Sequence, residues 1–214
     1  DPPSPRTPLP ANGDGTTSPY ELNSTWYSAL NREDCDETMD FKIKRFLASR
    51  SIALVMMGVP GIYLHGLFGS KNDADAVLDE GQTRSISRRS FDQESLYQTL
   101  DDPDTSTHKI AYGFGDMTAL RAREKAFHPN AEQRVLKVSD ALFALVRTSI
   151  DEKEQIICVT NITSRDQQIT IDLSEQGLNT RSWLDILSEH LFMADGNVLD
   201  LDLPPYQVLW LKNE

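Results

Sequence analysis

The stretch Ile52–Asp73, IALVMMGVPGIYLHGLFGSKND, decides the fold predicted for this chain. A continuous apolar run leads into Gly58–Gly61, where glycine and proline are typical of a tight turn, and a second short apolar run follows. The pattern predicts that Ile52–Met57 ends a buried helix and that Ile62–Leu64 is a short strand buried on both faces, as in a parallel sheet. In parallel α/β folds ligands bind at the loops leaving the carboxyl ends of strands, so Gly66–Arg89 becomes the candidate binding loop.

Helical spacing of apolar residues occurs on both sides of this stretch. Asp36 and Ser90 are the residues expected to cap two of the helices, because a short polar side chain can accept a free main-chain N–H there. The predicted helices are Ser24–Leu30, Asp36–Met57, Ser90–Leu100 and Asp104–Phe127.

From Val135 onward the sequence alternates between apolar and polar residues, which predicts an antiparallel sandwich. Turn residues separate the expected strands Leu142–Thr148, Gln155–Asn161, Gln167–Leu173, Arg181–Leu187, Val198–Leu203 and Gln207–Lys212. The fold class is therefore α/β plus all-β. We expect residues 1–17 to be an irregular segment or loop, residues 18–132 to be the α/β part and residues 133–214 to be an antiparallel β domain.

Composition and charge exclude several classes of function. The net charge of −12 over 214 residues argues against nucleic-acid and anionic membrane partners, because no basic stripe is present. Glycines and a proline interrupt the longest apolar run, which argues against a membrane helix. The spacing of Cys35 and Cys158 favours two reduced thiols over one long disulfide, and no signal peptide is visible, so a cytoplasmic location is expected.

Motifs for a cofactor, a metal ion or a catalytic nucleophile are missing from the sequence, so no cofactor, metal ligand or catalytic residue is predicted here. Carboxylates are plentiful, yet none follows a segment that looks like a buried strand. A pair of glycosidase carboxylates therefore cannot be assigned.

Three residues are candidates for binding a sugar. Arg84 opens a cluster of three arginines in the candidate loop, and a guanidinium can clamp hydroxyls, a carboxylate or a phosphate. Tyr20 and Glu21 offer a ring and a carboxylate, which suit carbohydrate recognition. Composition alone favours the simpler interpretations, a solvated basic turn for the arginine cluster and a surface loop pinned by Tyr20 in the core. His65 is either an acid–base group or, more commonly for a lone histidine among apolar residues, a structural one.

Four motifs together resemble the C-terminal third of the sucrose phosphorylase group of glycoside hydrolase family 13. They are SPYELNSTWYSAL (residues 18–30), GVPGIYLHGLFGSKND (58–73), GQTRSISRRSFD (81–92) and LPPYQVLWL (203–211). The first motif resembles the glucosylglycerate phosphorylase-type members most. Sucrose phosphorylases typically carry an aspartate at the position of Ser18 and a glutamine at that of Glu21, which argues against sucrose. The group commonly has asparagine where this chain has Ser87, so the surroundings of Arg84 can differ.

The resemblance implies the C-terminal part of a (β/α)₈ barrel followed by the β domain, with Ile62–Leu64 as the eighth barrel strand. It implies a retaining α-glucoside phosphorylase that transfers a glucosyl unit to phosphate, with the catalytic carboxylates on barrel strands upstream of Ser18. Tyr20 and Glu21 would line the acceptor and phosphate side, and Arg84 would hold the donor glucosyl unit. The implied partners are a small sugar, inorganic phosphate and the missing N-terminal barrel portion, and a homo-oligomer is compatible with this.

Two alternatives stay open at this point. A family 13 glucosidase or amylase would hydrolyse the glucoside without phosphate. A non-catalytic carbohydrate-binding β module would need an exposed row of aromatic rings, whereas Trp183 and Trp210 lie among apolar strand residues and are expected in the core.

Overall fold

A computed structural model describes residues 22–32 and 34–214. Tyr20, Glu21 and the segment 1–17 lie outside the described residues. The chain divides into two compact units, the first containing residues 1–37 and 62–111 and the second residues 38–61 and 112–214. The expected domain boundary near residue 133 stays a prediction.

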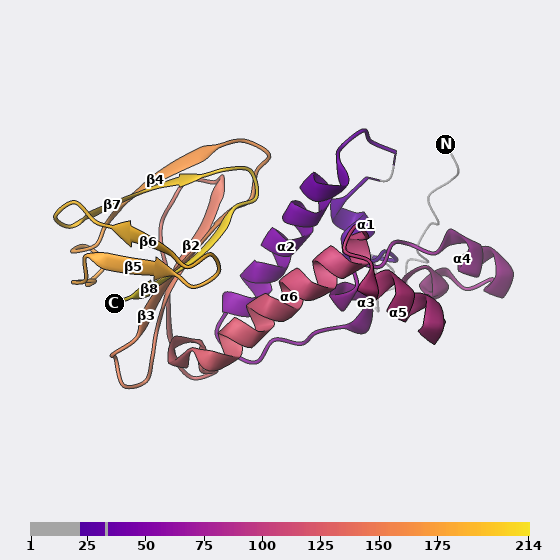
Figure 1. The fold of residues 1–214 in the computed structure, drawn as a ribbon, viewed down its shortest axis with the longest axis horizontal. Helices are drawn as coiled ribbons and strands as arrows, with labels where there is room; N and C mark the ends of the chain where they lie inside the picture. Colours follow the sequence, from indigo (N-terminus) through magenta and orange to yellow (C-terminus); the bar gives the residue numbers. More distant parts are fainter. Residues whose placement is uncertain (1–21, 33) are drawn as a thin grey trace, which may run out of the picture. The chain divides into compact units, whose positions relative to one another are not determined.

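Helices occupy most of the described chain before residue 128 (Figure 1). Hydroxyl or carboxylate side chains cap four of them. Thr25, Thr38, Asp73 and Asp92 each accept the main-chain N–H three residues ahead. Asp36 and Ser90 are therefore not the caps, because the helices begin two or three residues later than predicted. The helices are α1 (Trp26–Leu30), α2 (Met39–Val55), α3 (Leu64–Leu67), α4 (Ala74–Glu80), α5 (Gln93–Asp101) and α6 (Ser106–Arg123), with 3₁₀ turns η1 (Thr83–Ser87) and η2 (Lys125–Phe127).

The predicted strand at Ile62–Leu64 is wrong. Ile62 and Tyr63 have no regular secondary structure and Leu64 begins α3. The three side chains are 40%, 59% and 51% exposed. A buried strand needs neighbouring strands that bind its main-chain N–H and C=O groups. Among the described residues, all paired strands lie at Glu132 or later in the chain, so Ile62–Leu64 has no strand to pair with.

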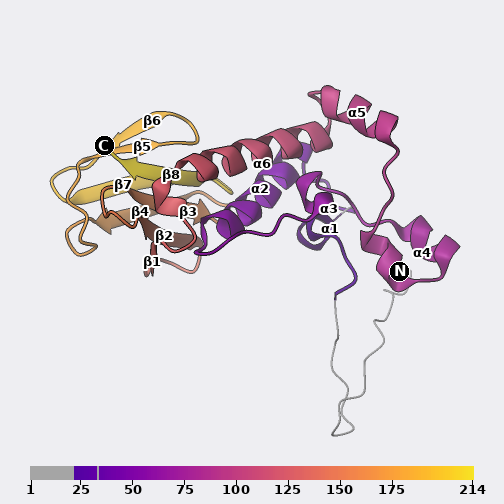
Figure 2. The same ribbon diagram turned by 90° about the horizontal axis from the view of Figure 1, so that it is seen from below.

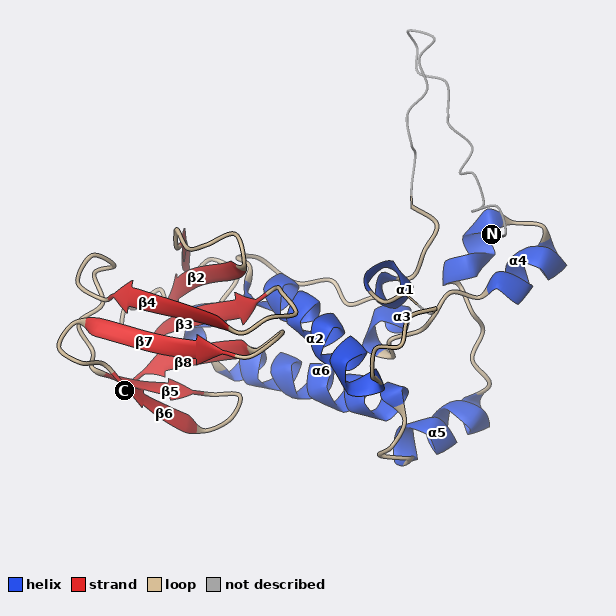
Figure 3. Ribbon diagram, turned by 90° about the horizontal axis from the view of Figure 1, so that it is seen from above, coloured by secondary structure: helices blue, strands red, loops and turns tan. Residues whose placement is uncertain are grey.

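The β domain is an antiparallel sandwich, as the alternating sequence predicts (Figure 3). One sheet has the order β1-β2-β3-β8-β5-β6, and the second sheet pairs β4 with β7. Two four-residue strands, β1 and β6, were not predicted from the sequence. The strands are β1 (Glu132–Val135), β2 (Leu142–Thr148), β3 (Gln155–Asn161), β4 (Gln167–Asp172), β5 (Ser182–Asp185), β6 (His190–Met193), β7 (Val198–Leu203) and β8 (Val208–Asn213).

The core of this sandwich lies between the two sheets. β7 alternates strictly between exposed and buried residues, so its leucines face the larger sheet. Trp183 and Trp210 are fully buried, as expected. β3 is buried along nearly its whole length because α2 packs against it, which explains its continuous apolar sequence. Cys158, in the middle of β3, is a free buried thiol whose pKa is raised by burial, and Cys35 is also free.

Helix α2 and the C-terminal part of α6 run side by side within the second unit (Figures 1 and 2). They approach closely at Gly113, where an added Cβ would lie 3.0 Å from a methyl group of Leu47. At the far end, Arg121 of α6 donates to the carbonyl oxygens of Leu54 and Gly58 at 2.6 and 2.9 Å. The arginine therefore fixes the turn that follows α2.

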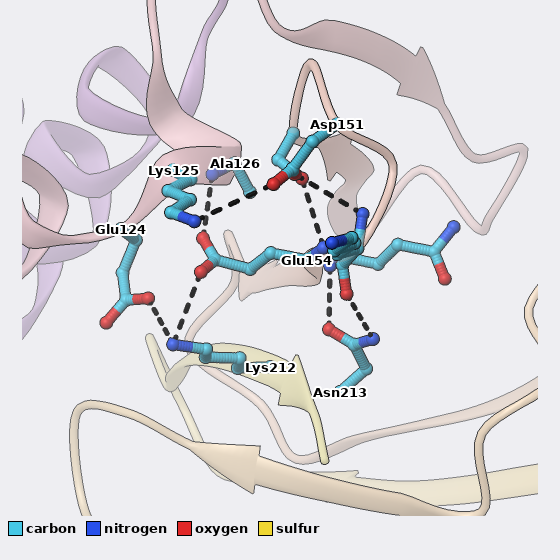
Figure 4. Close-up of polar contacts among 10 residues, drawn as sticks. Glu124, Lys125, Ala126, Asp151, Glu154, Lys212 and Asn213 are labelled. Carbon is cyan, nitrogen blue, oxygen red and sulfur yellow. Dashed lines mark hydrogen bonds and ion pairs between the residues drawn. The ribbon is translucent and has the colours of Figure 1, made fainter.

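A polar network joins the start of η2 to the β2–β3 turn and to β8 (Figure 4). Lys212 of β8 lies 2.5 Å from Glu124 and 3.4 Å from Glu154. Glu154 also accepts the main-chain N–H of Ala126 at 2.7 Å. Burial lowers the pKa of Lys212, but the two carboxylates outweigh this and the net pKa is raised. The lysine stays charged and connects three segments that are distant in sequence.

No helix in the described part of the chain is long and apolar enough to cross a membrane.

Candidate carbohydrate-binding site

The candidate site lies in the first unit, around the loop Ser70–Asp73 that follows α3. Gly69 precedes this loop with φ +59°. A Cβ at this position would collide with the side chain of Ile110, so both the backbone angle and the space require glycine. The close approach of α6 to this glycine sets where the loop begins.

Asn72 connects the loop to the start of α1. Its Oδ1 accepts the main-chain N–H of Thr25 at 2.7 Å and the Ser24 hydroxyl at 3.3 Å. Its own main-chain N–H donates to Ser28 Oγ at 3.0 Å. Three hydrogen bonds thus hold a segment 44 to 48 residues away in sequence, and this segment begins three residues after Glu21.

Asp73 connects the same loop to the segment that carries Arg84. Its main-chain N–H donates to the carbonyl oxygen of Ile86 at 2.9 Å, while its carboxylate caps α4 through Ala76 N at 3.1 Å. Arg89 lies 3.9 Å from the same carboxylate. α4 and η1 form a hairpin whose turn is closed by Gly81 at φ +64° and by a hydrogen bond from Ser85 to Glu80.

Arg84 lies in η1 and is exposed, while its neighbours Ser85 and Ile86 are buried. The buried neighbours fix the 3₁₀ turn, and the turn presents the guanidinium at the surface of the first unit. The role of Arg84 in binding a sugar stays a prediction.

His65 is a packed aromatic residue. Its ring stacks on Phe91 with centroids 5.2 Å apart and lies 5.0 Å from the ring of Tyr63. Nδ1 is 3.4 Å from the hydroxyl of Ser70, and burial lowers the pKa of the imidazole. A neutral ring held between aromatic side chains fits the structural interpretation better than acid–base chemistry.

A cavity of about 510 Å³ adjoins the loop on the side of α5. Its walls combine the Phe68 and Phe91 rings with Lys71, Arg89 and several hydroxyl side chains. Arg84 does not line this cavity. Within the same described part of the chain, no cluster of three His, Cys, Asp or Glu side chains could hold a metal ion.

The loop Ser70–Asp73 holds both the start of α1 and the η1 segment that carries Arg84, through Asn72 and Asp73. This loop lies within Gly66–Arg89, the candidate binding loop predicted from the sequence. Its partners Ser24, Thr25 and Ser28 were missed, although hydroxyls at positions i and i+3 or i+4 of a short helix are a signal of a shared polar face. Whether Tyr20 and Glu21 lie near Arg84 is outside the described residues.

Comparison with known structures defines the class of the fold. The chain superposes on AmyP in complex with maltose with a TM-score of 0.70 and 14% identity, over 86% of this chain and 37% of that structure. Residues 133–210 match the Maltogenic Amylase, C-terminal domain family. The fold is therefore that of the C-terminal part of an α-amylase-type glycoside hydrolase.

Comparison with curated sequences narrows this class. The glucosylglycerate phosphorylase of Spirochaeta thermophila is 31% identical over 90% of this chain, and that of Allomeiothermus silvanus is 34% identical over 90%. The match covers 33% and 31% of those proteins, so the chain spans about a third of their length. Sucrose phosphorylases match more distantly, for example that of Agrobacterium vitis at 27% identity over 53% of the chain. The comparisons therefore confirm the resemblance to the C-terminal portion of the sucrose phosphorylase group of glycoside hydrolase family 13.

Proposed function

We propose that this chain is part of a retaining α-glucoside phosphorylase that transfers a glucosyl unit from a glucosylglycerate-like donor to phosphate and gives α-glucose 1-phosphate. The observation that supports it most is the similarity to glucosylglycerate phosphorylases over nine-tenths of the chain, which includes the candidate loop. A sucrose-like donor is the second choice, because the sucrose phosphorylases match over less of the chain.

The reaction would proceed in two displacements at the anomeric carbon. A carboxylate outside this sequence attacks and the glycerate-like alcohol departs with a proton from an acid/base carboxylate, which leaves a covalent glucosyl ester. A phosphate oxygen then attacks the same carbon and the carboxylate is released, so the α configuration is retained. Both catalytic carboxylates would be supplied by upstream barrel strands that this chain does not include.

This chain would contribute binding and support to that reaction. Arg84 would orient the donor glucosyl unit through hydrogen bonds to its hydroxyls. Tyr20 and Glu21 would form the acceptor side, where glycerate departs and phosphate arrives. Since the net charge of the chain is −12, an anionic acceptor needs a locally placed cation such as a guanidinium.

The full-length protein with glucosylglycerate, with and without phosphate, provides the test. We expect release of glucose 1-phosphate that requires phosphate and is faster than release from sucrose. Release of free glucose at a rate independent of phosphate would contradict the phosphorylase and favour a family 13 hydrolase. The Arg84→Lys variant serves as a matched comparison, because it keeps the charge but loses the planar fork, and we expect kcat/KM for the donor to fall roughly tenfold or more.

The non-catalytic β-module alternative has little support, because Trp183 and Trp210 are both fully buried. A cytoplasmic location and a homo-oligomer stay predictions from the sequence.

A further inference from the structure

We propose that the cavity of about 510 Å³ beside α5 binds a phosphorylated hexose. Lys71 and Arg89 would bind the phosphate group, and the rings of Phe68 and Phe91 would pack against the sugar. The lining residues all lie between residues 68 and 107, within the first compact unit. This inference goes beyond the proposed function, because it concerns a binding site and requires no reaction step.

The first argument is the charge of the cavity lining. Two cations, Lys71 and Arg89, outnumber the one carboxylate, that of Asp92, so the lining carries a net charge of +1 in a chain of net charge −12. The Asp92 carboxylate is engaged as the cap of α5, where it accepts Ser95 N at 2.9 Å and Ser95 Oγ at 2.8 Å. The local positive charge favours a single phosphate group, whereas the charge of the whole chain repels a polyanion.

The second argument is that both cations can reach a ligand. Lys71 is exposed, and the side chain of Arg89 is 60% exposed and lies 3.9 Å from the Asp73 carboxylate. An exposed ion pair at this distance contributes little stability, so the guanidinium can turn toward a bound phosphate at small cost. Its planar fork can then donate two hydrogen bonds to phosphate oxygens.

The third argument is the number of hydroxyl side chains in the lining. A hydroxyl donates to phosphate oxygens, and it both donates to and accepts from the hydroxyls of a sugar. Ser106 and Thr107 belong to the first turn of the 18-residue helix α6, where the positive end of the helix dipole also favours an anion. The hydroxyl residues of the lining are Ser70, Ser90, Ser95, Thr99, Ser106 and Thr107.

The fourth argument is the aromatic part of the lining, which favours a sugar phosphate over phosphate alone. The Phe68 and Phe91 rings meet edge to face with centroids 5.4 Å apart, and His65 stacks on Phe91 with centroids 5.2 Å apart. This packing holds the two phenyl rings in place in the absence of a ligand. Apolar ring surfaces suit the C–H groups of a hexose, and the cavity volume is typical of small-molecule sites. Inorganic phosphate would leave the rings without a contact.

Isothermal titration calorimetry of the full-length protein tests the binding, with glucose 6-phosphate as the probe and with inorganic phosphate and glucose as comparison ligands. We expect saturable binding of glucose 6-phosphate that is at least about threefold tighter than binding of either comparison ligand, because only the sugar phosphate contacts both the cations and the rings. Absence of glucose 6-phosphate binding, or an equal affinity for inorganic phosphate or glucose, would overturn the inference.

Substitutions at exposed positions locate the binding in this cavity. Lys71→Met and Arg89→Gln each remove one cation and should weaken glucose 6-phosphate binding about five- to tenfold. Arg88→Gln is the matched control and should leave the affinity unchanged, because Arg88 is an exposed neighbour that does not line the cavity. Equal effects of Arg88→Gln and Arg89→Gln, or unchanged affinity in both cation variants, would overturn the inference.

The Phe68→Leu variant tests the aromatic part of the lining. It should weaken binding of glucose 6-phosphate and leave binding of inorganic phosphate unchanged, and an unchanged preference for the sugar phosphate would overturn the inference. If this variant does not fold, hydrogen exchange of the wild-type protein provides the readout. Glucose 6-phosphate should slow exchange of main-chain amides in residues 89–99 and leave exchange in β3 unchanged, whereas slowing confined to segments outside residues 65–107 would overturn the inference.

Failure of this inference and failure of the proposed function are distinguishable. Phosphorolysis of glucosylglycerate by a protein that does not bind glucose 6-phosphate in this cavity would overturn the inference alone. Binding that Lys71→Met and Arg89→Gln weaken, in a protein without phosphate-dependent release of glucose 1-phosphate, would support the inference and refute the proposed function.

Discussion

The guanidinium of Arg147 donates to the carbonyl oxygen of Val55 at 2.8 Å, which joins strand β2 to the last residue of helix α2. Arg147 is fully buried, and its other donors go to the carbonyl oxygens of Glu132, His128 and Ala131. Burial lowers its pKa, yet an arginine stays charged, and the negative end of the helix dipole suits that charge. One side chain therefore connects the β domain to the helix that leads into the candidate site.

Replacing this arginine should be severely destabilising. Arg147→Met leaves several buried carbonyl groups without donors, so we expect a loss of about 3–5 kcal/mol in the free energy of unfolding. Urea unfolding followed by tryptophan fluorescence measures it. The exposed Arg181→Met provides the control and should change stability by less than about 0.5 kcal/mol. Equal effects of the two substitutions would contradict the role of the buried guanidinium.

Gly69 should not tolerate a side chain. Gly69→Ala combines a positive φ with a collision against Ile110, so we expect a loss of about 1–3 kcal/mol together with weaker sugar binding. Gly81→Ala carries a positive φ in open space and should cost less, and Gly66→Ala lies in open space without a positive φ. Thermal unfolding of the three variants separates backbone strain from crowding. If Gly69→Ala is as stable as Gly66→Ala, the contact between Ile110 of α6 and residue 69 does not require a glycine there.

His65 should make stability depend on pH. Burial lowers its pKa in the folded state, so the unfolded chain binds the proton more readily. The contribution of the neutral His65 side chain to the free energy of unfolding is fully present above about pH 6.5, the pKa of histidine in the unfolded chain. This contribution is lost as the pH falls from that value toward the lower pKa of the folded state. His65→Phe keeps a ring between Tyr63 and Phe91 but cannot titrate. Between about pH 7 and pH 5 the wild type should lose stability relative to this variant, and parallel pH profiles in urea unfolding would contradict this.

Lys212 should stabilise the polar network at the end of α6. Lys212→Met leaves Glu124 and Glu154 facing each other, with side chains only 12% and 14% exposed, and we expect a loss of about 1–3 kcal/mol. The added substitution Glu124→Gln should recover part of this loss because it removes one of the two charges. Lys137→Met, at an exposed position, is the control. Thermal unfolding measures the stability of each variant. If the double variant is no more stable than Lys212→Met, repulsion between the two carboxylates is not the cause of the loss.

The β domain could be predicted from the sequence because its signals are local. Alternation and the turn residues between the strands predicted β2, β3 and β7 with their observed bounds. β6 was missed because four residues with one partly buried side chain carry too little pattern. The predicted strand at Ile62–Leu64 failed for another reason, since an apolar run becomes a parallel strand only if neighbouring strands are present.

The candidate site was less predictable because it depends on contacts between distant residues. Arg84 could be selected for its chemistry, but α4 and η1, which present it, were expected as loop. Asn72 could not be assigned to Thr25, because nothing local in a sequence shows which of many polar side chains will satisfy a main-chain N–H 47 residues away. The network of Lys212 with Glu124 and Glu154 was beyond sequence reasoning for the same reason.

The measurement that tests the central claim most directly is ¹H NMR of the full-length enzyme acting on glucosylglycerate in the presence of phosphate. Retaining phosphorolysis predicts α-glucose 1-phosphate as the first-formed sugar product, in a one-to-one ratio with released glycerate. Free glucose as the first product at every phosphate concentration, or β-glucose 1-phosphate, would contradict it.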